Sequence, residues 1–241
     1  MPSSFNKYPP GFGPATVPEL PQSALPAVPP ARLTPEAVRA RFAHPPVWAP
    51  EVRSEPRFPG QALSRAAVLM PLVVRPDGLT VLLTERTQEL RAHAGQIAFP
   101  GGKVDPQDRD PIDTALREAA EEVALPRPSA QVLGVLPPYV TSSRYAITPV
   151  VALITPGFAL RPNPSEVAQV FEAPLAFLMD PAHHHWHRFV PGGLDGQNAA
   201  RREWFSMPWH GPAVVGGPPR EWFIWGATAG MLRNFYRFLA A

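Results

Sequence analysis

The segment formed by residues 101–125 places three glutamates within about one helical turn. It reads GGKVDPQDRDPIDTALREAAEEVAL, with Arg117 directly before Glu118, Glu121 and Glu122. Positions three and four apart share a helix face, so these carboxylates repel one another unless a cation lies between them. A hard divalent metal, which takes oxygen ligands, is the natural cation. Taken alone, EAAEE also fits a solvated acidic helix face.

The residues around this turn define the ends of its helix. Asp110 is expected to cap the helix, and Pro111 suits the first helical position. Asp113 then lies in the first turn, where the helix dipole favours an anion. Pro126 disfavours helix at the residue before it, so the helix is expected to stop at Leu125.

The rest of the chain predicts an α/β domain with a mixed sheet between helices. Residues 66–74 and 79–86 are expected to be strands joined by a Pro-Asp-Gly turn at 75–78. A short helix is expected after Thr34 as its N-cap. The remaining assignments are strands at 130–140 and 147–155, a hairpin at 183–190 and 202–209, a closing helix at 221–240, and either helix or strand and turn at 164–180.

Composition limits the classes of function. The absence of cysteine excludes a disulfide framework, a cysteine-ligated zinc site and a cysteine nucleophile. The net charge of +2 comes with no long basic block and so gives no indication of nucleic-acid binding. No apolar run approaches twenty residues and no secretory signal is recognisable, so a cytoplasmic protein without a membrane partner is expected.

The N-terminal part is rich in proline. Nine of the 35 prolines fall in the first thirty residues, a composition that favours extended or disordered chain. Residues 1–33 are therefore expected to form a disordered tail, and residues 34–241 the folded domain.

The acidic helix and the residues before it resemble the sequence box of the Nudix hydrolases. That box runs Gly, five residues, Glu, seven residues and then Arg-Glu-U-x-Glu-Glu-x-Gly-U, where U is apolar. Here Gly102 is followed by Asp108 and, after eight residues, by REAAEEVAL. Three departures are an Asp at 108, one extra residue before Arg117, and Ala124 in place of Gly. The extra residue puts a direct metal role for Asp108 in doubt, and Ala124 suggests a helix exit without positive φ.

A second pattern lies just upstream. Residues 82–102, LLTERTQELRAHAGQIAFPGG, look like the signature of the coenzyme A pyrophosphatases of this family, with Thr87 for Ser as the one change. The resemblance covers roughly residues 34–241. It implies a Nudix-type α/β/α sandwich with a mixed β-sheet.

The activity implied by this resemblance is hydrolysis of the diphosphate bond of coenzyme A, a small-molecule substrate, with Mg²⁺ or Mn²⁺ as cofactor. The products would be 4′-phosphopantetheine and adenosine 3′,5′-bisphosphate. Two alternatives remain. One is a Nudix hydrolase for another nucleoside diphosphate derivative, such as an ADP-sugar or a dinucleoside polyphosphate. The other is a catalytically silent nucleotide-binding regulator.

The resemblance also assigns candidate site residues. Glu118 and Glu122, four apart, are the first candidates for metal ligands, and Glu121, about 60° round the helix from Glu118, is expected to add a further contact. The backbone carbonyl of Gly102 is a fourth candidate, and Arg117 is expected to orient a carboxylate. For the general base, Glu166 is preferred over Glu172, with Glu121 or Glu122 as the alternative within the box.

Cations and a cluster of histidines complete the set. Arg86, Arg91 and Lys103 are candidates to bind the phosphates of the substrate, since arginine matches phosphate bidentately. Arg144, in the segment TSSRY, is expected to line the nucleotide pocket, although a plain hairpin loop also fits. The cluster formed by His183, His184, His185 and His187 is interpreted as a loop, because no partner spacing completes a tetrahedral metal site. The aromatic C-terminal helix leaves a homodimer open.

Overall fold

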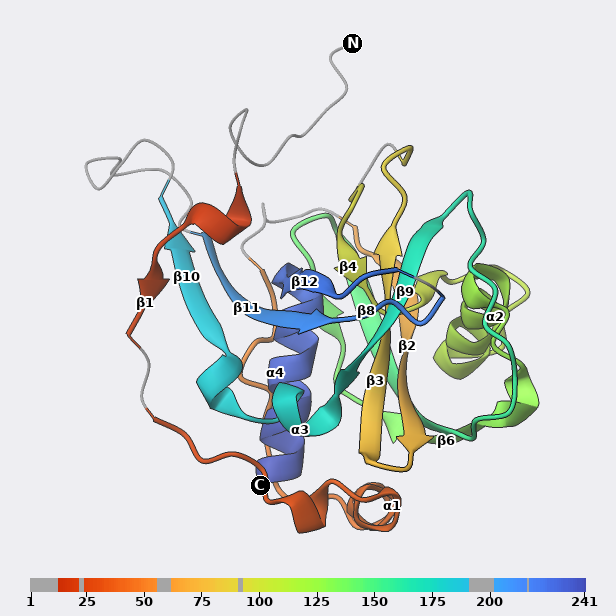
Figure 1. The fold of residues 1–241 in the computed structure, drawn as a ribbon, viewed down its shortest axis with the longest axis horizontal. Coiled ribbons are helices and arrows are strands. Elements are labelled where there is room, and N and C mark those ends of the chain that lie inside the picture. Colours follow the sequence, from red (N-terminus) through yellow and green to blue (C-terminus); the bar gives the residue numbers. More distant parts are fainter. Residues whose placement is uncertain (1–12, 22–23, 56–61, 91–92, 191–201, 216) are drawn as a thin grey trace.

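The computed structural model describes residues 13–21, 24–55, 62–90, 93–190, 202–215 and 217–241. Within these ranges the strands form two sheets (Figure 1). The larger, eight-stranded sheet contains β2 (Ser64–Arg75), β3 (Gly78–Arg86), β4 (Ile97–Ala98), β5 (Gly101–Lys103), β6 (Ala130–Val135), β7 (Tyr139–Val140), β8 (Tyr145–Ile154) and β9 (Val167–Pro174). The smaller contains β1 (Glu19–Leu20), β10 (His185–Phe189), β11 (Arg202–Gly211) and β12 (Arg220–Trp225).

The larger sheet is mixed, as the sequence predicts. Its centre is the parallel pair β2 and β8, in register from Ser64 opposite Tyr145 to Val73 opposite Ile154. The expected hairpin of β2 and β3 is also confirmed. Its turn is closed by Gly78 with φ of 120°, a backbone conformation that strongly favours glycine.

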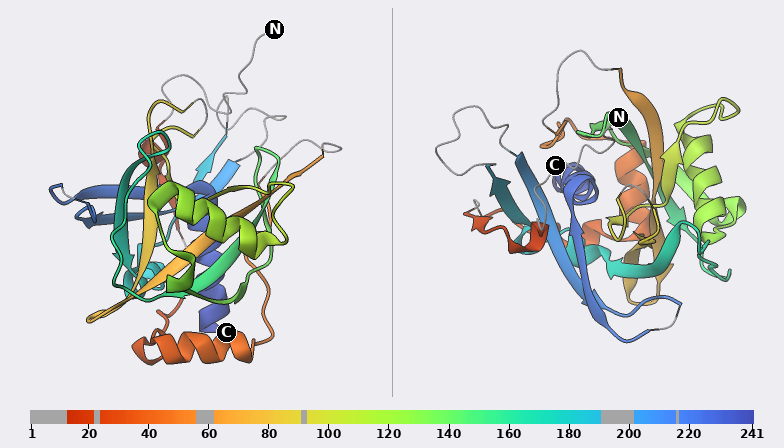
Figure 2. Two further views of the ribbon diagram at one scale, coloured as in Figure 1. Left: turned by 90° about the vertical axis from the view of Figure 1, so that its right-hand side faces the viewer. Right: turned by 90° about the horizontal axis from the view of Figure 1, so that it is seen from above.

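Helices cover both faces of this sheet. The four α-helices of the described residues are α1 (Pro35–Ala43), α2 (Pro111–Val123), α3 (Leu175–Leu178) and α4 (Gly226–Ala240). On one face α2 buries Ala115, Ala119 and Val123 against β2 and β8. On the other face α4 lies between the two sheets (Figures 1 and 2). The predicted α/β/α sandwich is therefore present, and the smaller sheet adds a further layer over α4.

Both predicted helix caps are confirmed. Asp110 Oδ1 accepts the Asp113 N–H at 2.8 Å, and Thr34 Oγ1 accepts the Ala37 N–H at 3.2 Å. Segment 164–180, for which the sequence allows either helix or strand and turn, forms β9 followed by the short helix α3. None of the described helices combines the length and the apolar character that crossing a membrane requires.

The expected closing helix begins five residues later than predicted. Residues 221–225 belong to β12, in which Trp222 and Ile224 are buried, and α4 starts at Gly226 with φ of 63°. Aromatic and β-branched residues suit a half-buried strand better than a helix. The prediction placed the helix start too early because the apolar residues of this strand run directly into the helical pattern of residues 226–240.

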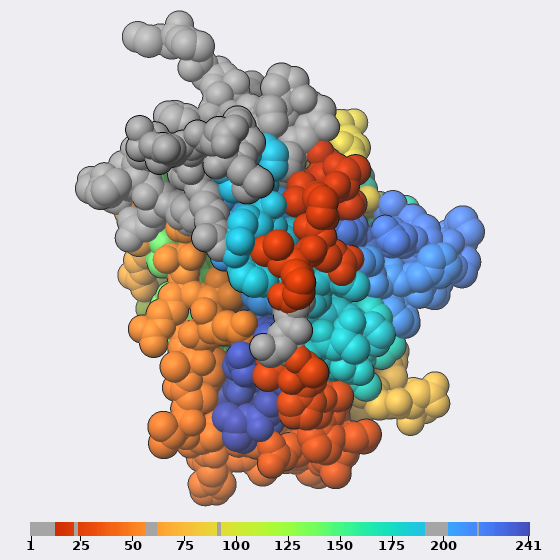
Figure 3. All heavy atoms as spheres, turned by 90° about the vertical axis from the view of Figure 1, so that its left-hand side faces the viewer, coloured from red at the N-terminus to blue at the C-terminus, as the bar shows by residue number. Residues whose placement is uncertain are grey.

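The prediction of a disordered tail is wrong for the described part of residues 13–33. Val28 is 3% exposed within the core, and the Pro26 carbonyl accepts the Tyr236 hydroxyl at 2.8 Å. Figure 3 shows this segment running along β10 towards the end of α4. Proline favours an extended chain without internal hydrogen bonds, but it does not prevent that chain from burying apolar side chains. Residues 1–12 lie outside the described part of the chain.

The end of α2 also differs from expectation. Ala124 has φ of 56° and ψ of 33°, which is the left-handed region. The Ala124 N–H donates to the Ala120 carbonyl at 3.1 Å and the Leu125 N–H to the Ala119 carbonyl at 3.2 Å, so the helix ends in an αL motif. The expectation that this exit needs no positive φ is therefore wrong, and Ala124 carries the strain that glycine would avoid.

Ala124→Gly is accordingly expected to raise the free energy of unfolding by about 0.5–1 kcal/mol, because glycine adopts the left-handed region without steric cost. Urea unfolding followed by circular dichroism measures the change. The matched control is Ala120→Gly in the helix interior, which should lower stability by about 1 kcal/mol. A loss of stability in both variants would contradict this account of the helix end.

Candidate active site

A cavity of about 600 Å³ brings together five of the charged residues predicted from the sequence. Its lining includes residues from α2, β3, β5, the segment 141–145, β11 and the start of α4. The predicted residues that line it are Arg86, Lys103, Glu118, Glu122 and Glu166, together with Gly102. Segments as far apart in the chain as Glu55 and Met231 thus meet at one concave site of a size typical for ligand binding.

Glu122 is the most buried of these acids. It is 2% exposed, and its Oε2 accepts the Gly101 N–H at 3.2 Å. The nearest cation is Arg86, whose Nη1 lies 3.8 Å from Oε1. Burial raises the pKa of Glu122 to about 8, despite the opposing Gly101 N–H and Arg86 charge, and nearby Glu118 and Glu166 add to the rise. The site is therefore short of positive charge.

Glu118 lies one helical turn before Glu122 and faces the same cavity. Burial raises its pKa, partly offset by the adjacent Arg117. Its carboxylate lies against Gly102, where an added Cβ would be 2.5 Å from Glu118 Cδ. A Cβ at Gly101 would likewise lie 2.5 Å from the Ala67 carbonyl oxygen. The missing side chain of Gly101 thus lets β5 approach β2 closely. The missing side chain of Gly102 lets the Glu118 carboxylate lie against β5.

Arg117 has the orienting role predicted for it. Its Nε and Nη2 each lie 3.0 Å from one oxygen of Asp108, and Nη1 lies 3.0 Å from both Glu118 Oε1 and Glu121 Oε2. Nη2 also donates to the Lys103 carbonyl at 3.2 Å. Asp108 is thus committed to Arg117, which fits the doubt about its direct metal role.

Glu121 is not brought into the cavity. Its side chain is 56% exposed, and its carboxylate is held by Arg117 at the surface. Glu121 lies only about 60° round the helix from Glu118, so it is the ion pair with Arg117 that turns its side chain away from the cavity. Its predicted metal and catalytic roles gain no support from this placement.

The two acids considered for the base occupy different places. Glu166 lines the cavity, in a loop tied to α2 by the Asn163 N–H, which donates to the Glu122 carbonyl at 2.8 Å. Glu172 on β9 is outside the cavity lining, with its carboxylate 3.0 Å from Arg75 Nε and 2.5 Å from Thr80 Oγ1. Glu172 therefore lies away from the site, and Glu166 is the one of these two acids that remains a candidate for the base.

Only some of the predicted phosphate-binding cations line the cavity. Arg86 and Lys103 line the cavity, and Arg86 Nε is buried without a hydrogen-bond partner among the described residues. Lys103 Nζ lies 5.7 Å from the centre of the Tyr145 ring. Arg144 is exposed and is not among the lining residues, although its neighbours in the TSSRY segment are. Arg91 lies outside the described residues.

Sequence reasoning missed two contributions to the cavity. Glu55 accepts the Ser142 N–H at 2.9 Å, bonds the Ser142 hydroxyl, and lines the cavity. Thr228 and Met231 of α4 close another side of it. Glu55 belongs to an irregular Pro-rich stretch with no periodicity, so no local signal distinguished it.

The histidine cluster forms no metal site. Within the described ranges, no group of three or more His, Asp or Glu side chains is arranged to hold a metal ion. The cluster is a loop only in part, because His185 and His187 lie on β10. His184 is buried against the Leu178 carbonyl and Arg233, and burial lowers its pKa to about 4.

The donor chemistry of the cavity nevertheless fits a divalent ion. Mg²⁺ is usually bound through one or two carboxylates, with water and substrate phosphates completing its shell. Glu118 and Glu122 provide such a pair beside the Gly101–Lys103 strand, and the raised pKa of Glu122 shows that its charge lacks compensation. These two residues would hold the ion.

Comparison with known proteins shows the family of this chain. A sequence model of the NUDIX domain matches residues 63–190, more than half of the chain. A protein of Escherichia coli (strain K12) named uncharacterized Nudix hydrolase NudL is 44% identical over 171 residues, which cover 70% of this chain and 80% of the relative. A protein of the same name from Photorhabdus laumondii is 41% identical over 169 residues, covering 70% and 81%.

Solved structures include a Nudix hydrolase of M. smegmatis, RenU, which is 22% identical. The match covers 49% of this chain and 81% of that one, with a TM-score of 0.41. The domain match and the sequence relatives decide the assignment. The chain belongs to the Nudix hydrolase family.

Proposed function

We propose that this Nudix hydrolase cleaves the diphosphate bond of coenzyme A or its derivatives. The observation that carries the proposal is that one cavity is lined by both sequence motifs. The acidic helix contributes Glu118 and Glu122, and the upstream segment contributes Arg86, His93, Gln96 and Phe99. The segment that resembles the coenzyme A signature therefore lies where it can contact a substrate held at the acidic helix.

In the proposed reaction, water adds across the diphosphate. Its hydroxyl bonds to one phosphorus, and the bridging oxygen leaves with the other phosphate. Glu166 accepts the proton of the water from its place in the cavity lining. The products are 4′-phosphopantetheine and adenosine 3′,5′-bisphosphate.

The remaining residues bind and position the substrate. Glu118 and Glu122 hold Mg²⁺ or Mn²⁺, which when bound neutralises phosphate oxygens and activates water. Arg86 and Lys103 face the diphosphate, and the unused Nε of Arg86 is a donor available for a phosphate oxygen. Positioning and charge stabilisation are most of what phosphoryl transfer requires.

Two other functions compete with this one. A Nudix hydrolase for an ADP-sugar or a dinucleoside polyphosphate would use the same acidic helix. The upstream segment in the cavity favours coenzyme A over these substrates. A silent nucleotide-binding module would not need Glu122, whose burial is costly unless an ion compensates its charge.

The expected result is selective hydrolysis of coenzyme A in a panel with ADP-ribose and NADH. Each substrate is incubated with Mg²⁺ or Mn²⁺, and products are identified by chromatography and mass spectrometry. Coenzyme A should give the two named products with a kcat/KM at least about tenfold above that for ADP-ribose, a difference equivalent to about 1.4 kcal/mol. A preference for ADP-ribose would overturn the substrate assignment, and no turnover of any compound would favour a binding module.

A further inference from the structure

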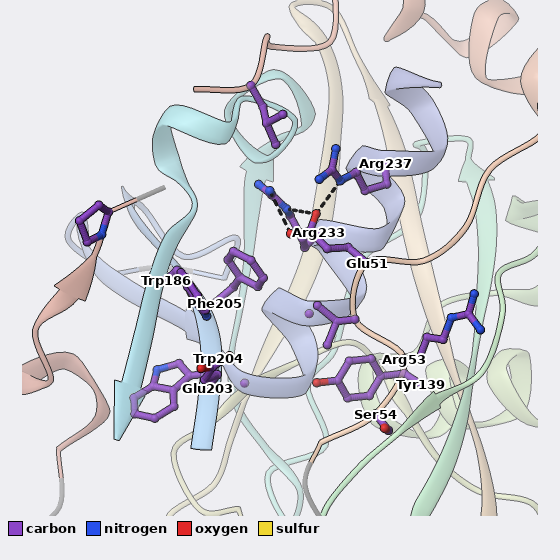
Figure 4. Close-up of a pocket in the computed structure, with 15 residues that line it drawn as sticks. Glu51, Arg53, Ser54, Tyr139, Trp186, Glu203, Trp204, Phe205, Arg233 and Arg237 are labelled. Carbon is purple, nitrogen blue, oxygen red and sulfur yellow. Dashed lines mark hydrogen bonds and ion pairs between the residues drawn. The ribbon is translucent and has the colours of Figure 1, made fainter. Parts of the chain in front are cut away.

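A second cavity, of about 980 Å³, adjoins the candidate active site. It lies between the smaller sheet, α4 and residues 51–54 (Figure 4). Glu203, Trp204 and Gly226 line both cavities. The two spaces therefore share a wall.

The walls of the second cavity combine aromatic side chains with charged ones. Trp186 on β10 and Phe205 on β11 stand on one side, and Tyr139 stands on the other (Figure 4). Gly226 and Gly230 of α4 line the space between them without side chains. Tyr139 packs closely on this helix, since a Cβ at Gly230 would lie 2.7 Å from its ring. The cavity thus offers aromatic surfaces interspersed with polar and charged groups.

Four of the five charged residues that line this cavity are paired. Arg233 Nε and Arg237 Nε lie 2.8 and 2.5 Å from Glu51 Oε2, and the two arginines converge on Glu51 in Figure 4. Glu203 Oε1 likewise accepts from Arg188 Nε at 2.8 Å. Arg53 points away from the aromatic side chains (Figure 4). The paired arginines are poor phosphate sites, in contrast to Arg86 in the first cavity.

We infer that the second cavity binds the non-nucleotide arm of the substrate, which under the proposed function is the pantetheine chain. That arm is uncharged and combines aliphatic carbons, amides and a terminal sulfur. It suits a lining that combines aromatic side chains with polar groups, whereas the adenosine 3′-phosphate requires unpaired cations. The diphosphate joins the two arms and lies at the acidic helix, so each arm needs a compartment that opens from there. This inference rests on the proposed function.

Trp186→Ala tests the inference because it removes one wall of the second cavity and touches no residue of the first. We expect KM for coenzyme A to rise about tenfold with kcat unchanged, as uniform binding energy is lost. Calorimetry should show about tenfold weaker binding of 4′-phosphopantetheine and unchanged binding of adenosine 3′,5′-bisphosphate. Ser54→Trp, which fills the cavity from an exposed position, should act in the same direction.

Trp209→Ala is the matched control. Trp209 is a half-buried tryptophan on β11 that packs against Phe177 and lines neither cavity, so its loss should leave KM unchanged. Melting temperatures confirm that each variant is folded. An unchanged KM in both Trp186→Ala and Ser54→Trp would overturn the inference while coenzyme A hydrolysis stands. Weaker binding of adenosine 3′,5′-bisphosphate would overturn it in favour of the nucleotide arm. If the unmodified enzyme does not cleave coenzyme A, the proposed function fails and the inference fails with it.

Discussion

Glu122→Gln is expected to lower kcat by at least about 100-fold while leaving the fold intact. The substitution keeps the shape of the side chain. It also keeps one oxygen that can accept the Gly101 N–H, which in the unmodified protein donates to the Glu122 carboxylate at 3.2 Å. It removes the negative charge that would hold the divalent ion beside Glu118. Activity is measured as product formation from coenzyme A at saturating Mn²⁺, and the fold by circular dichroism.

The same substitution should change how stability depends on pH in the absence of metal. The pKa of Glu122 is about 8 in the folded protein, above its ordinary value of 4.5, so the unfolded chain loses this proton first as pH rises. The stability linked to Glu122 is complete below pH 4.5 and is lost between pH 4.5 and about 8. Gln does not ionise, so with EDTA at pH 8 the variant should be more stable than the unmodified protein by on the order of 1–3 kcal/mol.

Addition of metal should reverse this order. An ion that binds only the folded state stabilises it by mass action. Mg²⁺ or Mn²⁺ should therefore raise the melting temperature of the unmodified protein and have little effect on Glu122→Gln. Equal responses of the two proteins to metal would exclude Glu122 as a ligand.

Substitutions of two other glutamates should distinguish metal binding from proton transfer in the site. Glu121→Gln changes an acid on the same helix that is 56% exposed and outside the cavity lining, so its activity should stay within about tenfold of the unmodified enzyme. Glu166→Gln should lower kcat but retain the thermal response to metal, since Glu166 is proposed as the base and not as a ligand. A loss of that response in Glu166→Gln would instead make it a ligand.

The local features of the site were predictable because they depend on residues close in sequence. The cap at Asp110, the helix behind it and the shared face of Glu118 and Glu122 all follow from spacing within one element. The hairpin of β2 and β3 follows from two apolar runs around a Pro-Asp-Gly turn. The resemblance of the upstream segment placed Arg86 near this helix, and the cavity lining agrees.

Features that depend on distant contacts were not predictable in the same way. Glu55 reaches the cavity because Ser142, 87 residues away, binds it. Glu121 is directed to the surface by Arg117, which a helix projection does not show. The packing of Val28 and Pro26 depends on α3 and α4, so the composition of the first thirty residues gave no indication of it. The second cavity likewise requires a sheet whose strands lie far apart in the chain.

Asp108→Asn is expected to lower the free energy of unfolding by about 2–3 kcal/mol, although Asp108 contacts neither metal ligand. The Asp108 side chain is 3% exposed and receives two hydrogen bonds of 3.0 Å from Arg117. Its Oδ2 also accepts from Thr114 Oγ1 at 2.8 Å and from the Asp105 N–H at 2.9 Å. Asparagine loses the charge and one acceptor, which leaves the Nε and Nη2 side of the partly buried guanidinium without a carboxylate partner.

The destabilisation should become smaller in acid. Hydrogen bonds from Arg117 hold the pKa of Asp108 well below its usual value of 3.8, so the stability linked to this carboxylate is present above pH 3.8 and is lost as pH falls below it. Urea unfolding of the two proteins at pH 7 and pH 3 measures the difference. A deficit in the variant that is as large at pH 3 as at pH 7 would point to packing rather than to the ion pair.

Activity should fall with the same substitution, by about 10- to 100-fold, because Arg117 also lies 3.0 Å from Glu118 and helps to orient it. In a double-mutant cycle with Arg117→Met, the two changes should cost less together than the sum of their separate costs, since each removes the same interaction. Asp113→Asn is the matched control. Asp113 lies on α2, the helix that carries Arg117, and pairs with Arg109 and Arg127 away from the cavity, so its substitution should leave activity unchanged. Strict additivity of Asp108→Asn and Arg117→Met would show that the two residues act independently, and the orientation of Glu118 would then need another source.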